Sequence, residues 1–409
     1  MSVALVPELR FPEFVDDWEA KIVDNIAQKI GSGVTPKGGK QSYLDEGIPL
    51  IRSQNVNRDT VILDDVAFIS EATHAAMSNS HVEDGDILLN ITGASIGRSA
   101  LVSTGISPAN VNQHVCIIRL RQNDNAAFLQ RLISAWQGQR EIFRTQAGGG
   151  REGLNFEAIK AFKFSFPSLP EQKKIAAFLS AVDAKLAAVE AQLTGWRDFK
   201  RGMMQALFSQ TLRFKADDGS DFPDWENKKL EEIAKFIGGG TPSKNVDAYW
   251  KGNLPWISSS DIEEQHILRV SITRHISEAG AKSSATKLIP KGSLLMVTRV
   301  GVGKVAIAPI DLYASQDFTA LLDLQANNVF LAYQFLARPR DLNGLEQGST
   351  IKGIPLEVLR TFDVLLPSLA EQQKIADALS AIDSKIEALT TRLDATREFK
   401  RGLLQKMFV

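Results

Sequence analysis

The chain has 409 residues, of which 44% are hydrophobic and 23% charged, and its formal net charge is -1. These values are ordinary for a soluble globular protein of two or three domains, and they exclude a global basic field that would draw the whole chain to nucleic acid. The single cysteine, Cys116, excludes an internal disulfide framework and favours a reducing compartment. No apolar run reaches about 18 residues, and residues 1–10 lack a signal-peptide core, so we expect a cytoplasmic protein.

Motifs of the first half of the chain return in the same order in the second half. Leu9-Arg10-Phe11 followed by Trp18 opens the first copy, and Leu212-Arg213-Phe214 followed by Trp225 opens the second. An aromatic pair at a domain entrance most often closes the edge of a core, so we assign these two segments no function. The order of the matches indicates a tandem duplication.

A glycine-rich turn follows in each copy. It carries a hydroxyl and a lysine, which are Thr35 and Lys37 in the first copy and Thr241 and Lys244 in the second. Backbone amides freed by glycine can hold a phosphate oxygen beside such side chains, although either turn alone could also be a plain loop. The near match of residues 33–40 to a P-loop fails because glycine stands at 39, where the motif needs its lysine.

Next, an apolar strand runs into a polar tip in each copy, at residues 48–56 and 254–262. The apolar frame is shared, whereas the tips differ. The tip residues are Arg52, Gln54 and Asn55 in the first copy and Ser258, Ser259 and Ser260 in the second. Arginine, glutamine and asparagine form bidentate contacts with guanine and adenine edges. Different tips on a shared frame suit two modules that read different DNA targets.

Residues 85–102 and 292–308 each predict a strand, a turn and a strand. The turns carry Thr92, Ser95 and Arg98 in the first copy and Arg299 and Lys304 in the second, and Gln113 and Gln316 follow before the next apolar strands. Glycines in these turns permit close backbone approach, and the cations offer phosphate contacts. We therefore predict DNA-binding turns; the alternative is a surface hairpin with solvated charges.

Residues 128–143 and 329–336 have helical patterns, and residues 148–159 parallel residues 348–359. Short strands then lead to positions 168 and 368. Mixed short strands and helices predict two tandem α/β domains of mixed α+β character.

Each copy ends in a long predicted helix that starts at Ser-Leu-Pro-Glu-Gln (168–172) or Ser-Leu-Ala-Glu-Gln (368–372). Ser168 and Ser368 are the expected N-caps, and Glu171 and Glu371 are expected to complete a capping box. Apolar residues spaced 4 and 3 apart then form a heptad seam, made of Ile175, Leu179, Val182, Leu186, Val189, Leu193 and Trp196 in the first copy and Ile375, Leu379, Ile382, Ile386, Leu389 and Leu393 in the second. Such a seam requires a partner helix, and each copy is the obvious partner of the other, although a heptad pair alone could be only a stiff strut.

The linker between the copies favours antiparallel pairing of the two helices. Each helix would be about 58 Å long. The thirteen or so residues between 208 and 222 span at most about 45 Å, which is too short to return the chain for a parallel pair. Antiparallel pairing would place one domain at each end of the coiled coil, an arrangement that fits two DNA half-sites roughly one helical turn or a little more apart.

At this point the chain resembles the specificity subunit of a type I restriction-modification system over essentially its whole length. The most specific marks are residues 166–175 and 366–375 and the two Phe-Lys-Arg-Gly segments at 199–202 and 399–402. The resemblance implies a first target-recognition domain at residues 1–167, a central long helix at 168–210, a second target-recognition domain at 211–367 and a C-terminal long helix at 368–409.

The resemblance also implies a protein without a catalytic site of its own that binds a split, asymmetric sequence in double-stranded DNA. It would recruit two modification (methyltransferase) subunits, and with ATP-driven restriction subunits the complex would translocate and cleave DNA. S-adenosylmethionine, ATP and Mg²⁺ would belong to those partners, so we expect no cofactor in this chain.

Gly202 and Gly402 interrupt the two long helices at a cost of about 1 kcal/mol each. We hypothesise that a helix of the modification subunit packs against these positions. Its contacts would be Phe199, Gly202, Met203, Phe399, Gly402 and Leu403. An intramolecular four-helix junction is the alternative.

Two other functions compete with DNA recognition. A self-contained methyltransferase or nuclease is disfavoured because the chain has no Asn/Asp-Pro-Pro-Tyr motif and its five histidines are not at ligand spacing. A non-catalytic tandem-domain scaffold that binds protein or carbohydrate stays open.

Overall fold

The computed structural model describes residues 6–146, 153–338, 341–342, 344–345 and 353–409. The chain forms two compact units: unit 1 comprises Met1–Val189 and Arg392–Val409, and unit 2 comprises Glu190–Thr391. Each long helix is divided between the units, so each unit holds one globular part and a segment of both helices. Part of the predicted start, residues 1–5, and part of the matched segments, residues 148–152 and 348–352, lie outside the described residues.

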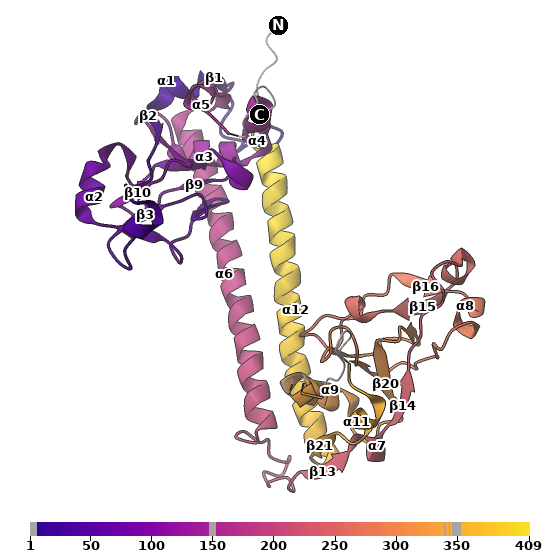
Figure 1. Ribbon diagram of the computed structural model, residues 1–409. Coiled ribbons are helices and arrows are strands. Elements are labelled where there is room, and N and C mark those ends of the chain that lie inside the picture. Colours follow the sequence, from indigo (N-terminus) through magenta and orange to yellow (C-terminus); the bar gives the residue numbers. More distant parts are fainter. Residues whose placement is uncertain (1–5, 147–152, 339–340, 343, 346–352) are drawn as a thin grey trace. The chain divides into compact units, whose positions relative to one another are not determined.

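Among the described residues, the strands of unit 1 form sheets ordered β6-β3-β10-β7 and β2-β11-β8-β9, with the pairs β1-β12 and β4-β5 beside them. The strands are β1 (Glu19–Ile22), β2 (Ala27–Ser32), β3 (Ile48–Ile51), β4 (Val56–Asn57), β5 (Thr60–Val61), β6 (Ala67–Ile69), β7 (His81–Val82), β8 (Ile87–Asn90), β9 (Ser99–Leu101), β10 (Ala109–Val111), β11 (Val115–Leu120) and β12 (Lys163–Phe166). The helices are α1 (Val23–Ile26), α2 (Glu71–Ala76), α3 (Ala126–Ser134), α4 (Trp136–Gln146), α5 (Phe156–Lys160) and the first part of α6 (Leu169–Phe208), as Figure 1 shows. β3 and β10 are parallel, which brings Ile51 and Val111, the last residues of both strands, to the same edge.

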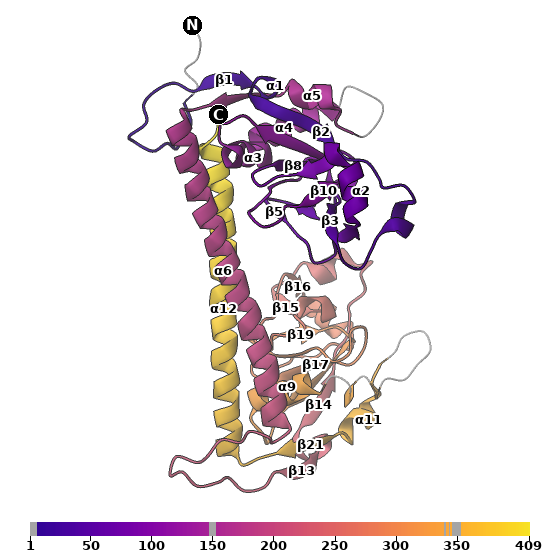
Figure 2. The same ribbon diagram turned by 90° about the vertical axis from the view of Figure 1, so that its left-hand side faces the viewer.

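Unit 2 repeats this plan, with sheets ordered β14-β20-β17-β18 and β16-β15-β19 and the pair β13-β21 among its described residues (Figure 2). The strands are β13 (Glu226–Lys229), β14 (Lys235–Gly238), β15 (Leu254–Ile257), β16 (Arg274–Ile276), β17 (Leu294–Val297), β18 (Val305–Ile307), β19 (Tyr313–Ala314), β20 (Phe318–Leu322) and β21 (Asp363–Leu366). The helices include α7 (Leu230–Ile233), α8 (Glu278–Lys282), α9 (Asn328–Ala337), α11 (Leu356–Arg360) and the first part of α12 (Leu369–Lys406). The parallel pair is now β15 and β19. The mixed α/β prediction and the tandem repeat are confirmed, whereas the helix predicted at 128–143 is divided into α3 and α4.

The entrance tryptophans close the cores, as expected. In unit 1 the ring of Phe128 contacts the rings of Trp18 and Phe408. In unit 2 Phe330 takes the same place and contacts Trp225 and Phe208. Each core therefore includes an aromatic residue at the end of a long helix, Phe208 of α6, or just beyond it, Phe408 after α12.

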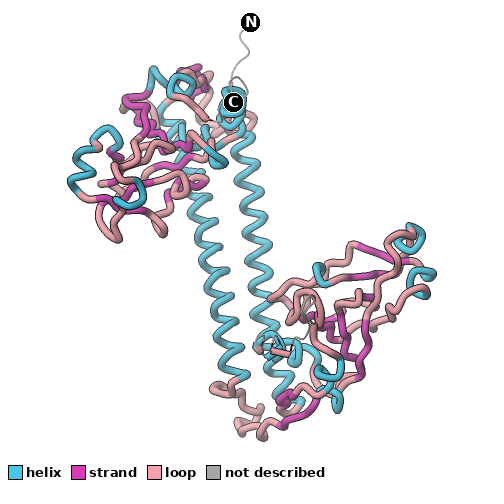
Figure 3. Tube along the Cα trace, viewed as in Figure 1, coloured by secondary structure: helices cyan, strands magenta, loops and turns pink. Residues whose placement is uncertain are grey.

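The two long helices pair in antiparallel fashion (Figure 3). In unit 1 Ile175 and Leu179 at the start of α6 pack with Leu403 and Met407 near the end of α12. Further along α6, Asp183 lies 2.7 Å from Lys400, so residue numbers rise on one helix as they fall on the other. The predicted seam residues Ile175, Leu179, Val182, Val189, Leu193, Ile375, Leu379, Ile382, Ile386, Leu389 and Leu393 are buried. The coiled-coil prediction is confirmed.

The repeated Glu-Gln at the helix starts anchors each helix to its own globular part. Both carboxylate oxygens of Glu171 accept hydrogen bonds from Arg10 at 2.8 Å. Glu371 accepts in the same way from Arg213, at 3.1 and 2.9 Å. Ser368 caps as predicted, since its hydroxyl accepts from the amide of Glu371. The reciprocal half of the capping box is wrong, because an arginine 158 or 161 residues away in sequence takes the carboxylate.

The lysines of the repeated Phe-Lys-Arg-Gly segments are buried and bind within the chain. In unit 2 the ammonium of Lys200 lies 2.6 Å from Asp383 of α12 and donates to the carbonyl of Gln265 at 2.9 Å. The Tyr333 hydroxyl of α9 also donates to Asp383, at 2.7 Å. Burial and the neighbouring Asp383 charge raise the pKa of Tyr333, so the hydroxyl keeps its proton at neutral pH. This cluster joins both long helices to α9 and to a loop of unit 2.

Unit 1 builds the matching cluster with more charges. Lys400 lies 2.6 Å from Asp59 and 2.7 Å from Asp183, and Arg131 of α3 pairs with the same two carboxylates. Burial alone would raise the pKa of Asp59, but the charges of Lys400 and Arg131 outweigh it and hold the pKa below its ordinary value. Asp59 therefore stays ionised and fastens the β4–β5 turn to the helix pair.

Within the described residues, every helix is too short or too polar to span a membrane.

Candidate nucleic-acid interface

The loop after β10, residues 112–114, is where the predicted segments of unit 1 meet. The amide of Gly33 donates to the carbonyl of Asn112 at 3.2 Å, and the amide of Asn112 donates to Ile51 at 3.1 Å. The amide of Ile91 donates to the carbonyl of His114 at 3.0 Å. The glycine-rich turn, the tip after β3 and the turn after β8 are thus joined to one loop.

The same convergence occurs in unit 2, around residues 315–317. The amide of Gly240 donates to Ala314 at 2.8 Å, and the amide of Ser315 donates to Ile257 at 2.9 Å. The amide of Thr298 donates to Asp317 at 2.8 Å. The glycine-rich turn, the tip, the hairpin turn and the loop that carries the glutamine therefore form one surface in each unit. The sequence showed only that each of these four segments has a counterpart in the other copy.

The glycines of the glycine-rich turns are explained by close backbone packing. A Cβ atom at Gly33 would lie 1.6 Å from the carbonyl oxygen of Val111, and one at Gly240 would lie 2.2 Å from the amide of Thr286. At Gly31 and Gly238 a Cβ atom would meet no atom within 4 Å. Because the amides of Gly33 and Gly240 already donate to carbonyls, the hypothesis that they cradle a phosphate is wrong for these two positions.

A threonine and a glutamine face each other in both units. The hydroxyl of Thr35 donates to the side-chain oxygen of Gln113, and Thr241 donates to Gln316 in the same way. Both glutamines are exposed, as are Lys37 and Lys244. The structure therefore brings together Thr35 with Gln113 and Thr241 with Gln316, and leaves two lysines beside them on the surface.

The tip of unit 1 is arranged around Asp65. Arg52 donates to the carbonyl of Asp65 at 2.9 Å, and Gln54 donates to its carboxylate at 2.7 Å. The guanidinium of Arg52 also lies over the ring of Tyr43. Arg52 is half-buried and Gln54 is exposed, so both remain candidates for base contacts.

Asn55 is not a base reader, which corrects its assignment. It is 3% exposed, its oxygen accepts from the amide of Arg52 at 3.0 Å, and its amide group donates to Ile62 at 3.0 Å. In unit 2 the carboxylate of Asp261 accepts from the amide of Ser258 at the same point of the turn. Both residues hold the turn that presents the tip.

The tip of unit 2 has a partner that the sequence did not reveal. Arg274 of β16 donates to the hydroxyl of Ser258 at 2.7 Å, pairs with Asp261 and lies over the ring of Trp256. Ser259 is half-buried and Ser260 is exposed. Arg274 has no counterpart in the first copy, so the comparison of repeats gave no signal for it.

The side chains of the hairpin turns are either exposed or engaged in contacts within the chain. Arg98 and Arg299 are exposed, and Ser95 is half-buried. Thr92 is bonded to His114 at 2.6 Å. Lys304 is turned toward the protein, with its ammonium 3.4 Å from the carbonyl of Ile262 and 4.0 Å from Glu264. Arg98 and Arg299 are therefore the cations that these two turns present to solvent.

Comparisons with known proteins agree with this arrangement. The family model for the type I restriction modification DNA specificity domain matches residues 15–194 and 223–396. The type I restriction enzyme MjaIX specificity subunit of Methanocaldococcus jannaschii is 30% identical over 212 residues, which cover 51% of this chain and about half, 49%, of that relative. The putative MjaX specificity subunit of the same organism is 24% identical over 413 residues, covering 96% of this chain and 93% of the relative.

A solved structure shares the fold. The type I restriction-modification S subunit from M. genitalium superposes with a TM-score of 0.61 at 15% identity, covering 99% of both chains. Two matched regions, one on each repeat, account for most of the sequence. The chain belongs to the family of the type I restriction modification DNA specificity domain.

Proposed function

We propose that this chain is the DNA-recognition subunit of a type I restriction-modification complex, in which each unit reads one half of a bipartite, asymmetric target. The convergence of the same four loops in both units carries the proposal. The frame and the Thr-Gln pair are shared, while the tips carry Arg52 and Gln54 in unit 1 and Ser258 to Ser260 in unit 2. Equal frames with different tips are suited to reading two different half-sites.

A selection from random duplex DNA tests this proposal. The chain is mixed with its modification subunit, and bound DNA is recovered by gel shift and sequenced. We expect enrichment of two constant blocks around a fixed gap. Recovery of no enriched sequence would overturn the proposal and favour a scaffold that binds protein or carbohydrate.

We further propose that the chain contributes recognition and no chemical step. The match of both repeats to the DNA specificity domain supports this proposal. S-adenosylmethionine, ATP and Mg²⁺ would bind to the modification and restriction subunits, and the complex would act on double-stranded DNA in the cytoplasm.

Replacing Arg299 by alanine distinguishes a base contact from a phosphate contact. If Arg299 reads a base, the variant accepts other bases at one position of the unit 2 half-site, with a loss of discrimination of about 1–3 kcal/mol. If it binds phosphate, affinity falls equally for all sequences and the salt dependence becomes shallower. The measurement is binding to a panel of single-substitution duplexes. Lys229→Ala, on β13 outside the loops, is the control, and equal behaviour of both variants would remove Arg299 from the interface.

We propose that the modification subunit packs against the Phe-Lys-Arg-Gly segments. Phe199 and Phe399 are 49% and 55% exposed, and a Cβ atom at Gly202 or Gly402 would meet nothing within 4 Å. The open glycines argue against the alternative of an intramolecular junction. Leu403 must be removed from the predicted contact set, because it is 5% exposed and packs in the core of unit 1. Met203 is half-buried and stays in the set.

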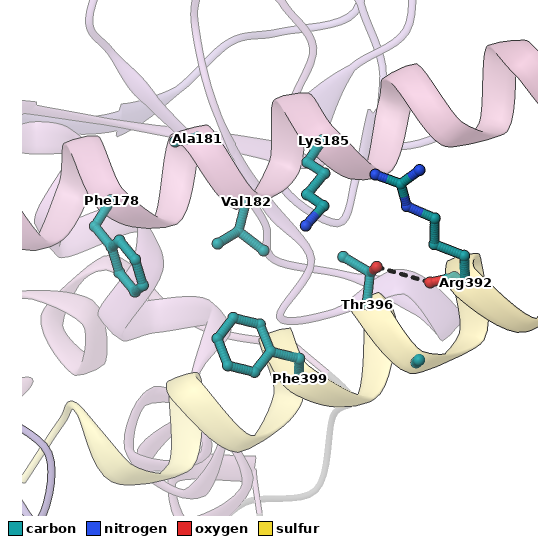
Figure 4. A pocket seen from close by; sticks show the side chains of 8 residues that line it. Phe178, Ala181, Val182, Lys185, Arg392, Thr396 and Phe399 are labelled. Carbon is teal, nitrogen blue, oxygen red and sulfur yellow. Dashed lines mark hydrogen bonds between the residues drawn. The ribbon is translucent and has the colours of Figure 1, made fainter.

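In unit 1 this surface includes an apolar groove between α6 and α12, with a volume of about 530 Å³. Figure 4 shows Phe178, Val182 and Phe399 turned toward this groove, with Lys185 and Arg392 at one end. Rings and aliphatic side chains flanked by two cations suit an amphipathic helix that carries acidic residues beyond its apolar face.

The variant Gly202→Leu, Gly402→Leu tests this docking surface. Because neither new side chain would meet an atom of this chain at its Cβ, we expect the chain to fold while co-purification with the modification subunit falls at least about tenfold, since a misplaced bulky group at an interface costs roughly 1–3 kcal/mol. Ala187→Leu, at an exposed position of α6 outside the segment, serves as control. Unchanged co-purification of the double variant would refute the surface.

A further inference from the structure

In unit 1 the side chain of Gln113 is the centre of a hydrogen-bonded chain that crosses three loops. Its oxygen accepts from the Thr35 hydroxyl, and its nitrogen lies 3.0 Å from Nε2 of His114. Nδ1 of His114 lies 2.6 Å from the hydroxyl of Thr92. The glutamine is therefore held at both ends of its amide.

The chemistry of the groups fixes the direction of each bond. An amide nitrogen has only donors to offer, so Nε2 of His114 must accept. The imidazole is then neutral with its proton on Nδ1, and that proton is donated to the Thr92 hydroxyl. In this state Gln113 retains one N–H and one oxygen lone pair for a ligand. Its side-chain amide cannot rotate without breaking the hydrogen bond to Thr35 or the one to His114.

In unit 2 the equivalent glutamine, Gln316, lacks the second hydrogen bond. The position of His114 is occupied by Asp317, whose carboxylate accepts from the Ser315 hydroxyl at 2.9 Å. The Thr298 hydroxyl, the counterpart of Thr92, lies 3.1 Å from Thr319. Among the described side chains of unit 2, Gln316 is hydrogen-bonded only to Thr241. One unit thus fixes its glutamine at two points, and the other at one.

We propose that His114 is a positioning residue that locks Gln113 as a two-point reader of an adenine in the unit 1 half-site. A fixed donor beside a fixed acceptor complements N7 and the N6 amino group of adenine, the pairing that glutamine makes with this base in the major groove. The inference rests on the proposed function, in which these loops face DNA. It predicts a sharper base preference at the Gln113 position than at the Gln316 position.

The backbone contacts of the loop do not depend on the imidazole, which makes the residue open to substitution. The amide of His114 donates to the side chain of Asn112, and its carbonyl accepts from Ile91. Leucine at position 114 keeps both bonds and removes the acceptor for Gln113. Glutamine at position 114 keeps an acceptor near the place of Nε2.

The test measures binding of the chain with its modification subunit to duplexes in which each position of the target is replaced in turn. For His114→Leu we expect a loss of discrimination of about tenfold, equal to about 1.4 kcal/mol, at one adenine of the unit 1 half-site, because the glutamine that forms the bidentate pair is no longer held in place. The unit 2 half-site and the thermal midpoint stay unchanged. His114→Gln restores the discrimination, and adding His114→Leu to Gln113→Ala has no further effect.

Three results would overturn the inference. They are full discrimination by His114→Leu, an equal loss at all positions of the half-site, and additive losses in the double variant. If the native chain itself shows no base preference in either half-site, the proposed function fails, and that outcome is distinct from failure of the role of His114 alone.

Discussion

Replacing Lys200 by methionine is expected to lower the stability of unit 2 by about 3–5 kcal/mol, the range for removing one partner of a buried ion pair. Lys200 is 6% exposed and Asp383 is 2% exposed, so the carboxylate would be left in the interior, and its remaining hydrogen-bond partner among the described residues is the Tyr333 hydroxyl. Hydrogen exchange of the α9 amides, which report on unit 2, measures the change.

The neighbouring residue gives a matched control for Lys200. Arg201 is exposed and, within the part of the chain that the structure describes, pairs with Asp198 one turn earlier, so Arg201→Met should change stability by less than about 0.5 kcal/mol. If the α9 amides are protected from hydrogen exchange equally well in Lys200→Met and in Arg201→Met, the buried ion pair does not stabilise unit 2.

Replacing Gly33 by alanine is expected to abolish recognition of one half-site. Since the Cβ atom would lie 1.6 Å from the carbonyl oxygen of Val111, the turn must move away from the loop that carries Gln113. Overpacking of a rigid site costs roughly 3 kcal/mol, and here the strained contact is between backbone segments. The measurements are the thermal midpoint of the chain and its affinity for the unit 1 half-site.

Gly31→Ala is the control, because it makes the same substitution two residues earlier in β2 where a Cβ atom would meet nothing within 4 Å. We expect native binding from Gly31→Ala and loss of the unit 1 half-site from Gly33→Ala. Equal binding by both variants would show that the contact between turn and loop is dispensable.

The sequence predicted those features that depend on local pattern. Helix starts expected at Ser168 and Ser368 lie one residue before α6 and α12. Most of the seam residues are buried, and Leu186 and Trp196 are half-buried, because heptad spacing places them all on one face of a helix. The matched turns also proved to be equivalent in space. The repeat made this prediction possible, because two copies of a loop in the same fold occupy equivalent positions.

Roles that depend on distant partners could not be predicted. The sequence predicts a local capping box for Glu171, but its carboxylate binds Arg10 from the start of the chain. The sequence predicts that Leu403 lies on a partner surface, although it is buried in the core of unit 1. A repeated arginine at 10 and 213 and a repeated glutamate at 171 and 371 could have suggested these pairs, since both members recur together.

His114 and Arg274 gave no such signal, because each occurs in one copy only. Their importance follows from the side chains that surround them after folding. A comparison of the two repeats detects only residues that occur in both, so it cannot detect the residues in which the two units differ.

The division of the chain between the units has a consequence for its synthesis. Unit 1 is built from residues far apart in the gene, since Met407 and Phe408 pack in the same core as Trp18 and Phe128. During synthesis all of unit 2 is therefore translated before the C-terminal segment that completes the core of unit 1. The N-terminal part of unit 1 is made first, but its core stays incomplete and accessible to chaperones and proteases until residues 407 and 408 have been translated.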